Sequence, residues 1–455
     1  MNSPNKKIGI IGGGPAGLAA AIKLNHYNFE IVLFEASEHN QITIGEHLAA
    51  EAIHEFKKLK IPETILKKNS IPCTEVQNAW GAQDIHYNES IFNPFGAGYI
   101  LTRPDFDADF FEHCFEIGID TKKGIRISKI HKVKSGWQIF TNDETTEVDF
   151  IIDATGRNSK FNFDFSIKKE KQDQLIGITK HINLNTTLAI NSSHLLVEPT
   201  ENGWWYTVQI ATGTIISTFM TDSSILKDSK ITSSEFWDIQ LENSNHTKAR
   251  LSTIEIPKKD FIKSAHSHIS KHLFGQNWLK VGDAAQSFDP LSSAGILKGL
   301  KMGQQAADAI YKHFSNDSTA LKVYEDEIKK QHKEYLKLKG EYYAKEPRWM
   351  HSSFWYKRNL KVKNIQHFTI VPQNNLNINL INSENKIIFL QQQLPEINFN
   401  VLIQCLQKNT IIKNAIYLYL KEMKASKMNP WLLYALESLK IIGILSLEVK
   451  KVECN

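Results

Sequence analysis

Residues 8–35 read IGIIGGGPAGLAAAIKLNHYNFEIVLFE and carry the clearest structural pattern in the chain. The apolar run at 8–11 predicts a short buried strand, and a glycine turn follows it directly. The alanine-rich stretch at 18–24 predicts a helix, and residues 30–35 predict a second buried strand. The sequence therefore predicts a strand–helix–strand unit at the beginning of the chain.

The glycine turn has the spacing Gly12-x-Gly14-x-x-Gly17, which is typical of a dinucleotide-binding turn. Gly12 permits the tight turn, Gly14 lets the backbone approach a pyrophosphate, and Gly17 lets the helix pack closely on the strand. Glu35 ends the second strand and can accept a hydrogen bond from a ribose hydroxyl. The predicted cofactor contacts in this unit are Gly12, Gly13, Gly14, Pro15, Ala16, Gly17, Glu35 and Ala36.

Two later segments are buried strands that end in small residues. Residues 150–156 read FIIDATG, and Gly156 lets the backbone pass close to a dinucleotide. Residues 278–283 read WLKVGD, and Asp283 can accept from a sugar or ribityl hydroxyl. The loop DPLSSAGI at 289–296 then opens a helix, whose N–H groups and positive dipole end would face a flavin. The predicted contacts here are Gly156, Asp283, Pro290, Gly295 and Ile296.

In this order and at these distances, the three motifs resemble those of FAD-binding oxidoreductases of the two-domain aromatic-hydroxylase type, a fold shared with flavin-dependent halogenases. The resemblance implies an α/β fold with a Rossmann-like FAD-binding domain and an inserted β-sheet substrate domain. It also implies O2 as co-substrate, NAD(P)H or an external reductant as electron source, and oxygen transfer from a C4a-hydroperoxide of the reduced flavin.

A further set of segments is similar to the flavoprotein maturases of tryptophylquinone-dependent oxidases, such as those of glycine oxidase and lysine oxidase. These segments are IGE (44–46), AWG (79–81), LTRPDFD (101–107), GWWY (203–206), SFDPLSSAGI (287–296), YYAKEPRW (342–349) and FW (354–355). The resemblance implies a monooxygenase that hydroxylates a tryptophan side chain in the precursor of such an oxidase. The implied partner is thus a protein substrate.

The 455 residues suggest two or three domains. We expect the FAD-binding domain at 1–170 and 257–360, the substrate sheet at 171–256, and a mainly helical C-terminal extension at 361–455 that can dock a partner. Helices are predicted at 296–314, 319–343 and 431–445, and alternating polarity predicts a strand at 374–381.

Two segments outside the glycine motifs are further candidates for FAD contact. Arg103 is an always-charged side chain that suits a phosphate, and a surface ion pair with Asp105 or Asp107 is the simpler alternative. Gly45 and Glu46 lie beside the FAD-binding domain and complete the predicted cofactor contacts.

The candidate catalytic residues are His47, Trp204, Tyr206 and Asp289. The ordinary pKa of a histidine such as His47 suits proton transfer near neutral pH. Strand alternation places Trp204 and Tyr206 on one face and Trp205 on the other, so the first two can wall a pocket for an indole. Asp289 lies where halogenases have an acid close to the flavin. Structural roles stay open as alternatives: sheet core for the aromatic side chains and a loop cap for Asp289.

Departures from the halogenase pattern favour hydroxylation. Residues 203–209 read GWWYTVQ and lack the Ile-Pro of the halogenase segment. Halogenases also carry a lysine that holds hypohalous acid downstream of the Gly-Glu step, and residues 70–121 contain no lysine. A lysine that reaches the site from elsewhere in the fold is the open alternative.

Two other functions stay open. The first is a halogenase or hydroxylase of a small aromatic molecule, such as free tryptophan, pyrrole or a phenol, which would turn over free aromatics with or without halide. The second is a flavin-bearing chaperone that docks on a precursor and has no chemistry of its own. It would bind FAD and its partner without forming an oxygen-dependent product.

Composition argues against other classes. The net charge of +5, from 54 Lys+Arg against 49 Asp+Glu, is too weak to indicate a nucleic-acid partner. No apolar run reaches the roughly 18 residues of a membrane helix, and the glycines at 12–14 interrupt the only signal-like stretch, so no membrane association is expected. Four widely spaced cysteines predict a reducing, cytoplasmic location, and no metal site is expected.

Overall fold

In the computed structural model, the predicted strand–helix–strand unit forms the centre of a six-stranded sheet with the order β19-β20-β11-β1-β2-β7. The strands are β1 (Lys7–Ile11), β2 (Glu30–Glu35), β7 (Asp120–Lys123), β11 (Phe150–Asp153), β19 (Phe274–Gly275) and β20 (Trp278–Lys280). Neighbouring strands are parallel except for β19 and β20. β11 is buried throughout and β1 and β2 nearly so, because both faces of this sheet are covered.

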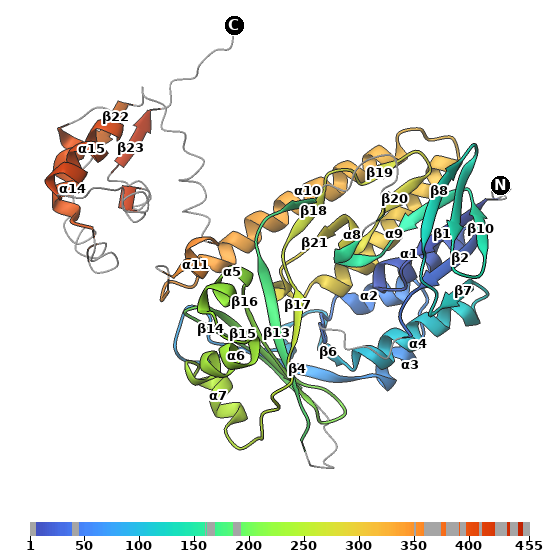
Figure 1. The fold of residues 1–455 in the computed structure, drawn as a ribbon, viewed down its shortest axis with the longest axis horizontal. Helices are drawn as coiled ribbons and strands as arrows, with labels where there is room; N and C mark the ends of the chain where they lie inside the picture. The colour runs from blue at the N-terminus through green and yellow to red at the C-terminus, as the bar shows by residue number, and fades with distance from the viewer. Residues whose placement is uncertain are drawn as a thin grey trace, which may run out of the picture. The chain divides into compact units, whose positions relative to one another are not determined.

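Helices cover one face of this sheet, and a small antiparallel sheet covers the other (Figure 1). The helical layer contains α1 (Pro15–His26), α4 (Arg103–Glu116) and α9 (Gly295–Phe314), which share a core with Ile8 and Ile10. The small sheet contains β8 (Lys129–Val133), β9 (Gly136–Phe140) and β10 (Thr145–Val148). This three-layer arrangement is the Rossmann-like domain that the sequence predicted.

A second, nine-stranded sheet has the order β17-β13-β16-β15-β14-β4-β6-β3, with β5 beside β4. Its strands are β3 (His47–Leu48), β4 (Ser70–Asn78), β5 (His86–Glu89), β6 (Gly98–Leu101), β13 (Leu175–Ile182), β14 (Ser193–Thr200), β15 (Gly203–Gln209), β16 (Ile215–Asp222) and β17 (Phe261–Ser264). The region predicted as the substrate sheet, 171–256, supplies β13 to β16. The other strands come from the flanking sequence, so this large sheet shares its strands with the FAD-binding region.

The two faces of the large sheet have different neighbours. One face packs against α5 (Ser223–Ser229), α6 (Ser233–Glu242) and α7 (His246–Leu251), with Trp205, Phe219 and Trp237 in the interface. Strand alternation places Tyr206 and Met220 on the other face. The predicted separation of Trp205 from Tyr206 is therefore confirmed.

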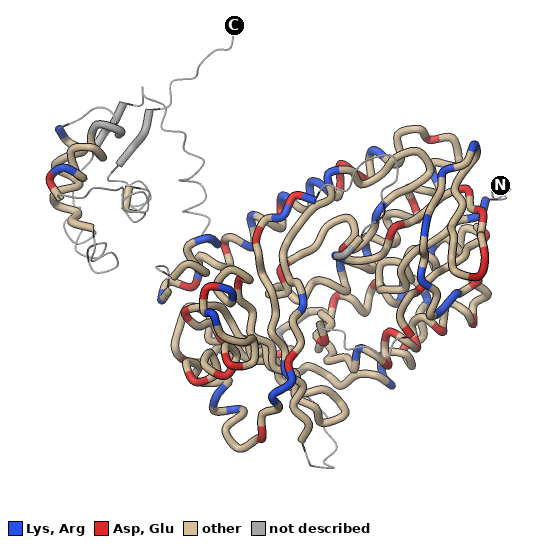
Figure 2. Tube along the Cα trace, viewed as in Figure 1, with Lys and Arg blue, Asp and Glu red and all other residues tan. Residues whose placement is uncertain are grey.

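The remaining elements before α10 are short helices and a third sheet. They are α2 (Ala52–Lys58), α3 (Glu63–Lys68), η1 (Ser90–Phe92), η2 (Gly156–Asn158), α8 (Gly282–Ala285), η3 (Pro290–Ser292) and a three-stranded sheet of β12 (Lys169–Lys171), β18 (His268–Ser270) and β21 (Gln286–Ser287). The long helix α10 (Ala320–Tyr343) follows, as predicted at 319–343, and Figure 2 shows basic and acidic residues alternating along it.

The structure describes residues 6–38, 45–159, 161, 169–184, 193–349, 352–358, 375–378, 391, 397–408, 412–423, 435–436 and 445–448. The chain divides into two compact units, 1–339 and 340–455, so the division falls within α10 and before the extension predicted from 361. No helix in these ranges is long and apolar enough to cross a bilayer.

The second unit contains α11 (Ser353–Tyr356), α14 (Phe399–Gln407), α15 (Ile412–Glu422) and the antiparallel pair β22 (Asn375–Ile378) and β23 (Leu445–Glu448). β22 confirms the strand predicted at 374–381. The helix predicted at 431–445 falls largely outside the described residues.

The contact between α1 and α9 depends on a glycine. A Cβ atom on Gly303 would lie 2.3 Å from the Ala16 carbonyl oxygen, far inside van der Waals contact. The helices can therefore approach this closely only because α9 has no side chain at this position.

We predict that Gly303→Ala destabilises the protein by about 1–3 kcal/mol through overpacking. This loss opposes the gain of about 1 kcal/mol that alanine normally brings to a helix. Urea denaturation measures the change, with Lys301→Ala on the exposed side of α9 as a control that shifts stability by about 0.5 kcal/mol or less. A Gly303→Ala protein as stable as the wild type would contradict the close packing.

Candidate active site

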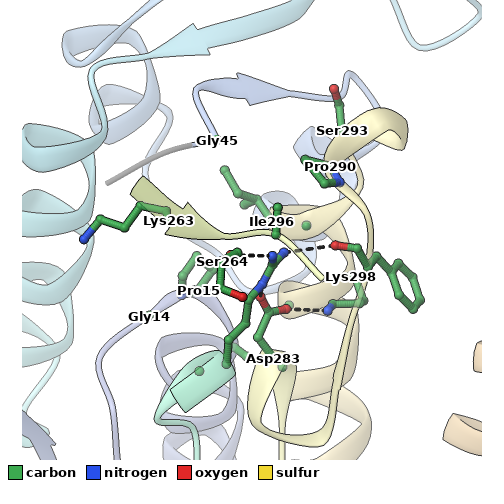
Figure 3. A pocket seen from close by; sticks show the side chains of 18 of the residues that line it. Gly14, Pro15, Gly45, Lys263, Ser264, Asp283, Pro290, Ser293, Ile296 and Lys298 are labelled. Carbon is green, nitrogen blue, oxygen red and sulfur yellow. Dashed lines mark hydrogen bonds and ion pairs between the residues drawn. The ribbon is translucent and has the colours of Figure 1, made fainter. Parts of the chain in front are cut away.

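A pocket of about 560 Å³ lies between the glycine turns and the large sheet, within the roughly 300–1,000 Å³ typical of ligand sites (Figure 3). The turns and loops next to the central sheet contribute Gly14, Pro15, Ala16, Ser37, Ala154, Gly156, Arg157, Gly282, Asp283, Phe288, Asp289, Pro290, Ser293, Gly295, Ile296, Lys298 and Gly299. The large sheet, its flanking residues and the start of α4 contribute Gly45, His47, Arg103, Gly177, Tyr206, Met220, Lys263, Ser264 and Ala265.

The three glycines of the first turn differ in their surroundings. A Cβ atom on Gly12 would lie 2.3 Å from the Ala154 carbonyl oxygen, and one on Gly17 would lie 2.0 Å from the Gly12 carbonyl oxygen. A Cβ atom on Gly14 would meet no atom within 4 Å, and Gly14 lines the pocket. Gly12 and Gly17 therefore shape the backbone, whereas Gly14 leaves open space for a ligand.

The N-terminus of α1 faces this space without a capping side chain. Gly14 is the N-cap residue and Pro15 the first residue of the helix, so the N–H groups of the first turn are available to an anion. Glu35 lies beside the turn, where its carboxylate accepts hydrogen bonds from the Gly13 and Ser37 N–H groups (both 2.6 Å). The sequence did not single out Ser37, which lines the pocket where Ala36 had been expected to contribute.

A second uncapped helix begins on the other side of the pocket. Gly295 is the first residue of α9, and its N-cap residue Ala294 provides no side-chain hydrogen bond. Gly156 and Gly295 both line the pocket. A Cβ atom on either glycine would meet nothing within 4 Å. Two helix N-termini without side-chain caps and open glycine surfaces in one pocket fit the pyrophosphate and ring system of FAD.

Asp283 is held between two cations. Its carboxylate accepts from Arg157 Nε (2.8 Å) and Lys298 Nζ (2.5 Å). Figure 3 shows the bond to Lys298 as a dashed line. Burial alone would raise the pKa of Asp283, but the Lys298 and Arg157 charges outweigh it and hold the pKa well below its usual range. Asp283 is therefore a fixed anion, and any contact with a cofactor hydroxyl would be additional to these ion pairs.

Arg157 also ties two loops to the site. Its guanidinium donates to the backbone oxygens of Ser264 and Phe288 (both 2.9 Å). The sequence analysis did not select Arg157 or Lys298, although Arg157 directly follows the glycine of the ATG motif.

Arg103 makes an ion pair, but a buried one. It pairs with both carboxylate oxygens of Asp107 (3.2 and 2.9 Å) and donates to the Gly45 carbonyl oxygen (2.9 Å). The alternative of an ion pair with Asp107 is thus correct in its partner, but the pair is not at the surface, because Arg103 is 8% exposed and lines the pocket. In this geometry Arg103 fixes Gly45, one of the predicted contacts, at the pocket wall.

The structure brings Tyr206 and His47 together at the pocket, whereas Trp204 packs behind it in edge contact with Trp80. Burial lowers the pKa of His47 to about 4, so its imidazole is neutral at physiological pH. Glu46 lies buried beside Tyr206 and does not line the pocket. Burial raises the pKa of Glu46, and burial together with the nearby Glu46 charge raises the pKa of Tyr206.

Asp289 lines the pocket and also caps a loop. Its Oδ1 accepts from the Leu291 N–H (3.0 Å), which is the structural role left open by the sequence. Its Oδ2 lies 3.4 Å from Lys339 Nζ. Asp289 therefore caps the loop and lines the pocket at the same time.

Lys263 is a pocket residue that the sequence analysis missed. It extends from β17, on the large-sheet side, and points away from the Asp283–Lys298 pair in Figure 3. Among the described residues its ammonium group makes no hydrogen bond or ion pair. Lys263 is far in sequence from the motifs that indicated the site, so only the tertiary fold brings it to the pocket.

No group of three or more His, Cys, Asp or Glu side chains in the described ranges is arranged to hold a metal ion.

Comparison with known proteins agrees with this geometry. The family model for pyridine nucleotide-disulphide oxidoreductases matches residues 6–179. LodB of Marinomonas mediterranea, named as an FAD-dependent oxidoreductase, is 29% identical over 357 residues, which cover 77% of this chain and 95% of LodB.

Two solved structures share the fold. The peptidyl tryptophan dihydroxylase QhpG, essential for tryptophylquinone cofactor biogenesis, superposes with a TM-score of 0.65 at 18% identity, over 78% of each chain. The myxobacterial chondrochloren halogenase CndH superposes with a TM-score of 0.71 at 15% identity, over 95% of this chain and 99% of CndH.

The pocket and these likenesses define the chain as an FAD-dependent oxidoreductase. It is similar in sequence to LodB, and it shares its fold with a flavin-dependent halogenase and a peptidyl tryptophan dihydroxylase.

We predict that Gly14→Val yields a folded protein that loses FAD, because the new side chain enters the pocket and clashes with no protein atom at its Cβ. The absorbance ratio of flavin to protein after purification measures occupancy, and circular dichroism checks the fold. Gly17→Ala is the contrasting variant, since its Cβ would collide with the Gly12 backbone and lower stability as well. Full FAD occupancy in Gly14→Val would argue against the assigned cofactor site.

Proposed function

We propose that this chain is an FAD-dependent monooxygenase that hydroxylates a tryptophan side chain of a precursor protein during tryptophylquinone biogenesis. The observation that carries the proposal is a single pocket that joins the Gly14 turn to the Tyr206 face of the large sheet. Supporting likenesses are the fold shared with QhpG and the sequence similarity to LodB. O2 as co-substrate and NAD(P)H or an external reductant belong to the same proposal.

Reduced FAD, when bound, supplies activation of O2 for transfer of one oxygen atom to an aromatic ring. The residues of this chain have other tasks. The N-termini of α1 and α9 hold the anionic part of the cofactor, and Met220, Phe288 and Ile296 limit the access of water to the reacting ring.

A proton must leave the ring carbon that gains oxygen, if aromaticity is to be restored. Two carboxylates line the pocket, Asp283 and Asp289. The two cations around Asp283 make it a poor proton acceptor, because they lower its pKa so strongly. We therefore assign the proton to Asp289, and the neutral imidazole of His47 is the second candidate.

The precursor requires a docking surface beyond the pocket, and we assign this to the C-terminal extension at 361–455. Deletion of the extension should weaken precursor binding while FAD occupancy stays unchanged. The proposal also places the protein in the cytoplasm, and the free thiols of Cys73, Cys114 and Cys405 are in keeping with a reducing compartment.

The direct test supplies FAD-loaded protein with reductant, O2 and a tryptophan-containing precursor or peptide. Mass spectrometry should detect added oxygen on a tryptophan.

We predict that Asp289→Asn keeps FAD but lowers turnover about 100-fold or more, as expected for loss of an acid–base group. Asp326→Asn, an exposed carboxylate on α10, is the control with unchanged turnover. Equal turnover in Asp289→Asn and wild type would remove Asp289 from the mechanism.

Halogenation of a small aromatic molecule is the second candidate, and Lys263 is the observation that favours it. Lys263 lines the pocket, and its ammonium group makes no hydrogen bond or ion pair with any residue that the structure describes. Residues 70–121, where halogenases carry their lysine, contain none. If this candidate is correct, halide and a free aromatic substrate give a halogenated product, which Lys263→Met abolishes and Lys259→Met does not. If the maturase proposal is correct, halide has no effect and the Lys263→Met variant still hydroxylates the peptide.

A protein that binds FAD and the precursor but forms no product would instead be a chaperone.

A further inference from the structure

We propose that Tyr335 and Lys339 of α10 are positioning residues that hold Asp289 and Phe288 in the pocket wall. The inference rests on the proposed function, in which Asp289 accepts a proton. Both residues lie outside every motif that the sequence indicated. Neither residue lines the pocket, but both side chains contact the loop that does.

Lys339 binds three oxygen atoms from three separate segments. Its ammonium group donates to Asp173 Oδ2 and to Ser267 Oγ (2.9 Å), and it lies 3.4 Å from Asp289 Oδ2. The side chains of Lys339, Asp173 and Asp289 are 9%, 8% and 2% exposed. In so buried a site, the Lys339 charge balances two carboxylates that would otherwise repel each other.

Asp173 anchors this arrangement to the large sheet. Its carboxylate also accepts from the Leu175 N–H (3.1 Å) and the Ser267 N–H (3.2 Å). Lys339 therefore connects the pocket carboxylate to the first residues of β13, and the position of Asp289 is fixed relative to the face that carries Tyr206.

Tyr335 holds the same loop through its backbone and through an aromatic ring. The Asp289 N–H donates to the Tyr335 hydroxyl oxygen (2.6 Å), and that hydroxyl also bonds to Ser267 Oγ (2.7 Å). The Tyr335 ring stacks on Phe288 with centroids 3.9 Å apart and planes 9° apart. Burial raises the pKa of Tyr335, so the hydroxyl keeps its proton and can donate to Ser267 while it accepts from Asp289.

The spacing of these residues explains why α10 can do this. His332, Tyr335 and Lys339 lie on one face of the helix, at separations of three and four residues. His332 Nδ1 contacts Gln286 Oε1 (3.1 Å), so the same face supports the loop from Gln286 to Asp289. The outward side of this turn of α10 carries Lys337, which is exposed.

The kinetic test compares Lys339→Met and Tyr335→Phe with Lys337→Met in FAD-loaded enzyme. We expect kcat to fall about tenfold or more in the first two, with KM and FAD occupancy unchanged, because small displacements of a reacting group are costly. Lys339→Arg should recover part of the loss. In an Asp289→Asn background, Lys339→Met should cause no further loss. Additive losses, or losses confined to KM or FAD occupancy, would overturn the proposal.

A second readout does not depend on the reaction. Amide hydrogen exchange in residues 286–291 should accelerate in FAD-loaded Lys339→Met and stay at the wild-type rate in Lys337→Met. Unchanged exchange in Lys339→Met would show that Lys339 does not position the loop, whatever the activity. Faster exchange in a protein whose wild type never hydroxylates tryptophan would support the positioning role and reject the proposed function.

Discussion

The close approach of backbone to backbone at the first glycine turn is the constraint on which the other features depend. Gly12 contacts the Ala154 backbone, and Gly17 contacts the Gly12 carbonyl, at distances that exclude any side chain. This brings β1, β11 and α1 together, and Gly303 then lets α9 pack on α1 with equal closeness. The N-termini of α1 and α9 consequently open into one pocket, where two positive dipole ends can serve a single anionic cofactor.

Most charged groups around that pocket are held in fixed pairs, and among the described residues Lys263 is the exception. Asp283 lies between Arg157 and Lys298, Arg103 is paired with Asp107, and Asp289 lies near Lys339. Paired charges tolerate burial, whereas an isolated one would be costly. Each pair also joins segments that are distant in sequence or fixes a loop at the wall. The electrostatic arrangement thus fixes the segments around the pocket relative to one another.

Much of the fold could be predicted from the sequence because the signals are local. The Gly12–Gly17 turn, the buried strands at 8–11 and 150–153, and the helix from 296 all depend on residues adjacent in the chain. The composition of the large sheet from strands distant in sequence could not be predicted. The pairing of β4 with β14, for example, joins segments whose sequences do not indicate that they pair. For the same reason, the sequence did not indicate that Lys263 and Lys339 belong to the site, because only tertiary packing brings them there. For Arg103, Asp107 was one of two partners considered from the sequence, whereas the burial of the pair follows from the tertiary fold and could not be predicted.

Fold and pocket together define a flavoenzyme, and its proposed specificity for a protein-bound tryptophan is the central claim. The most direct measurement is affinity purification of the tagged protein from its native host, followed by peptide mass mapping of what it retains. The account predicts a stoichiometric partner in which one tryptophan gains oxygen only when O2 and a reductant are supplied. The absence of any such partner, together with turnover of a free aromatic molecule, would contradict it.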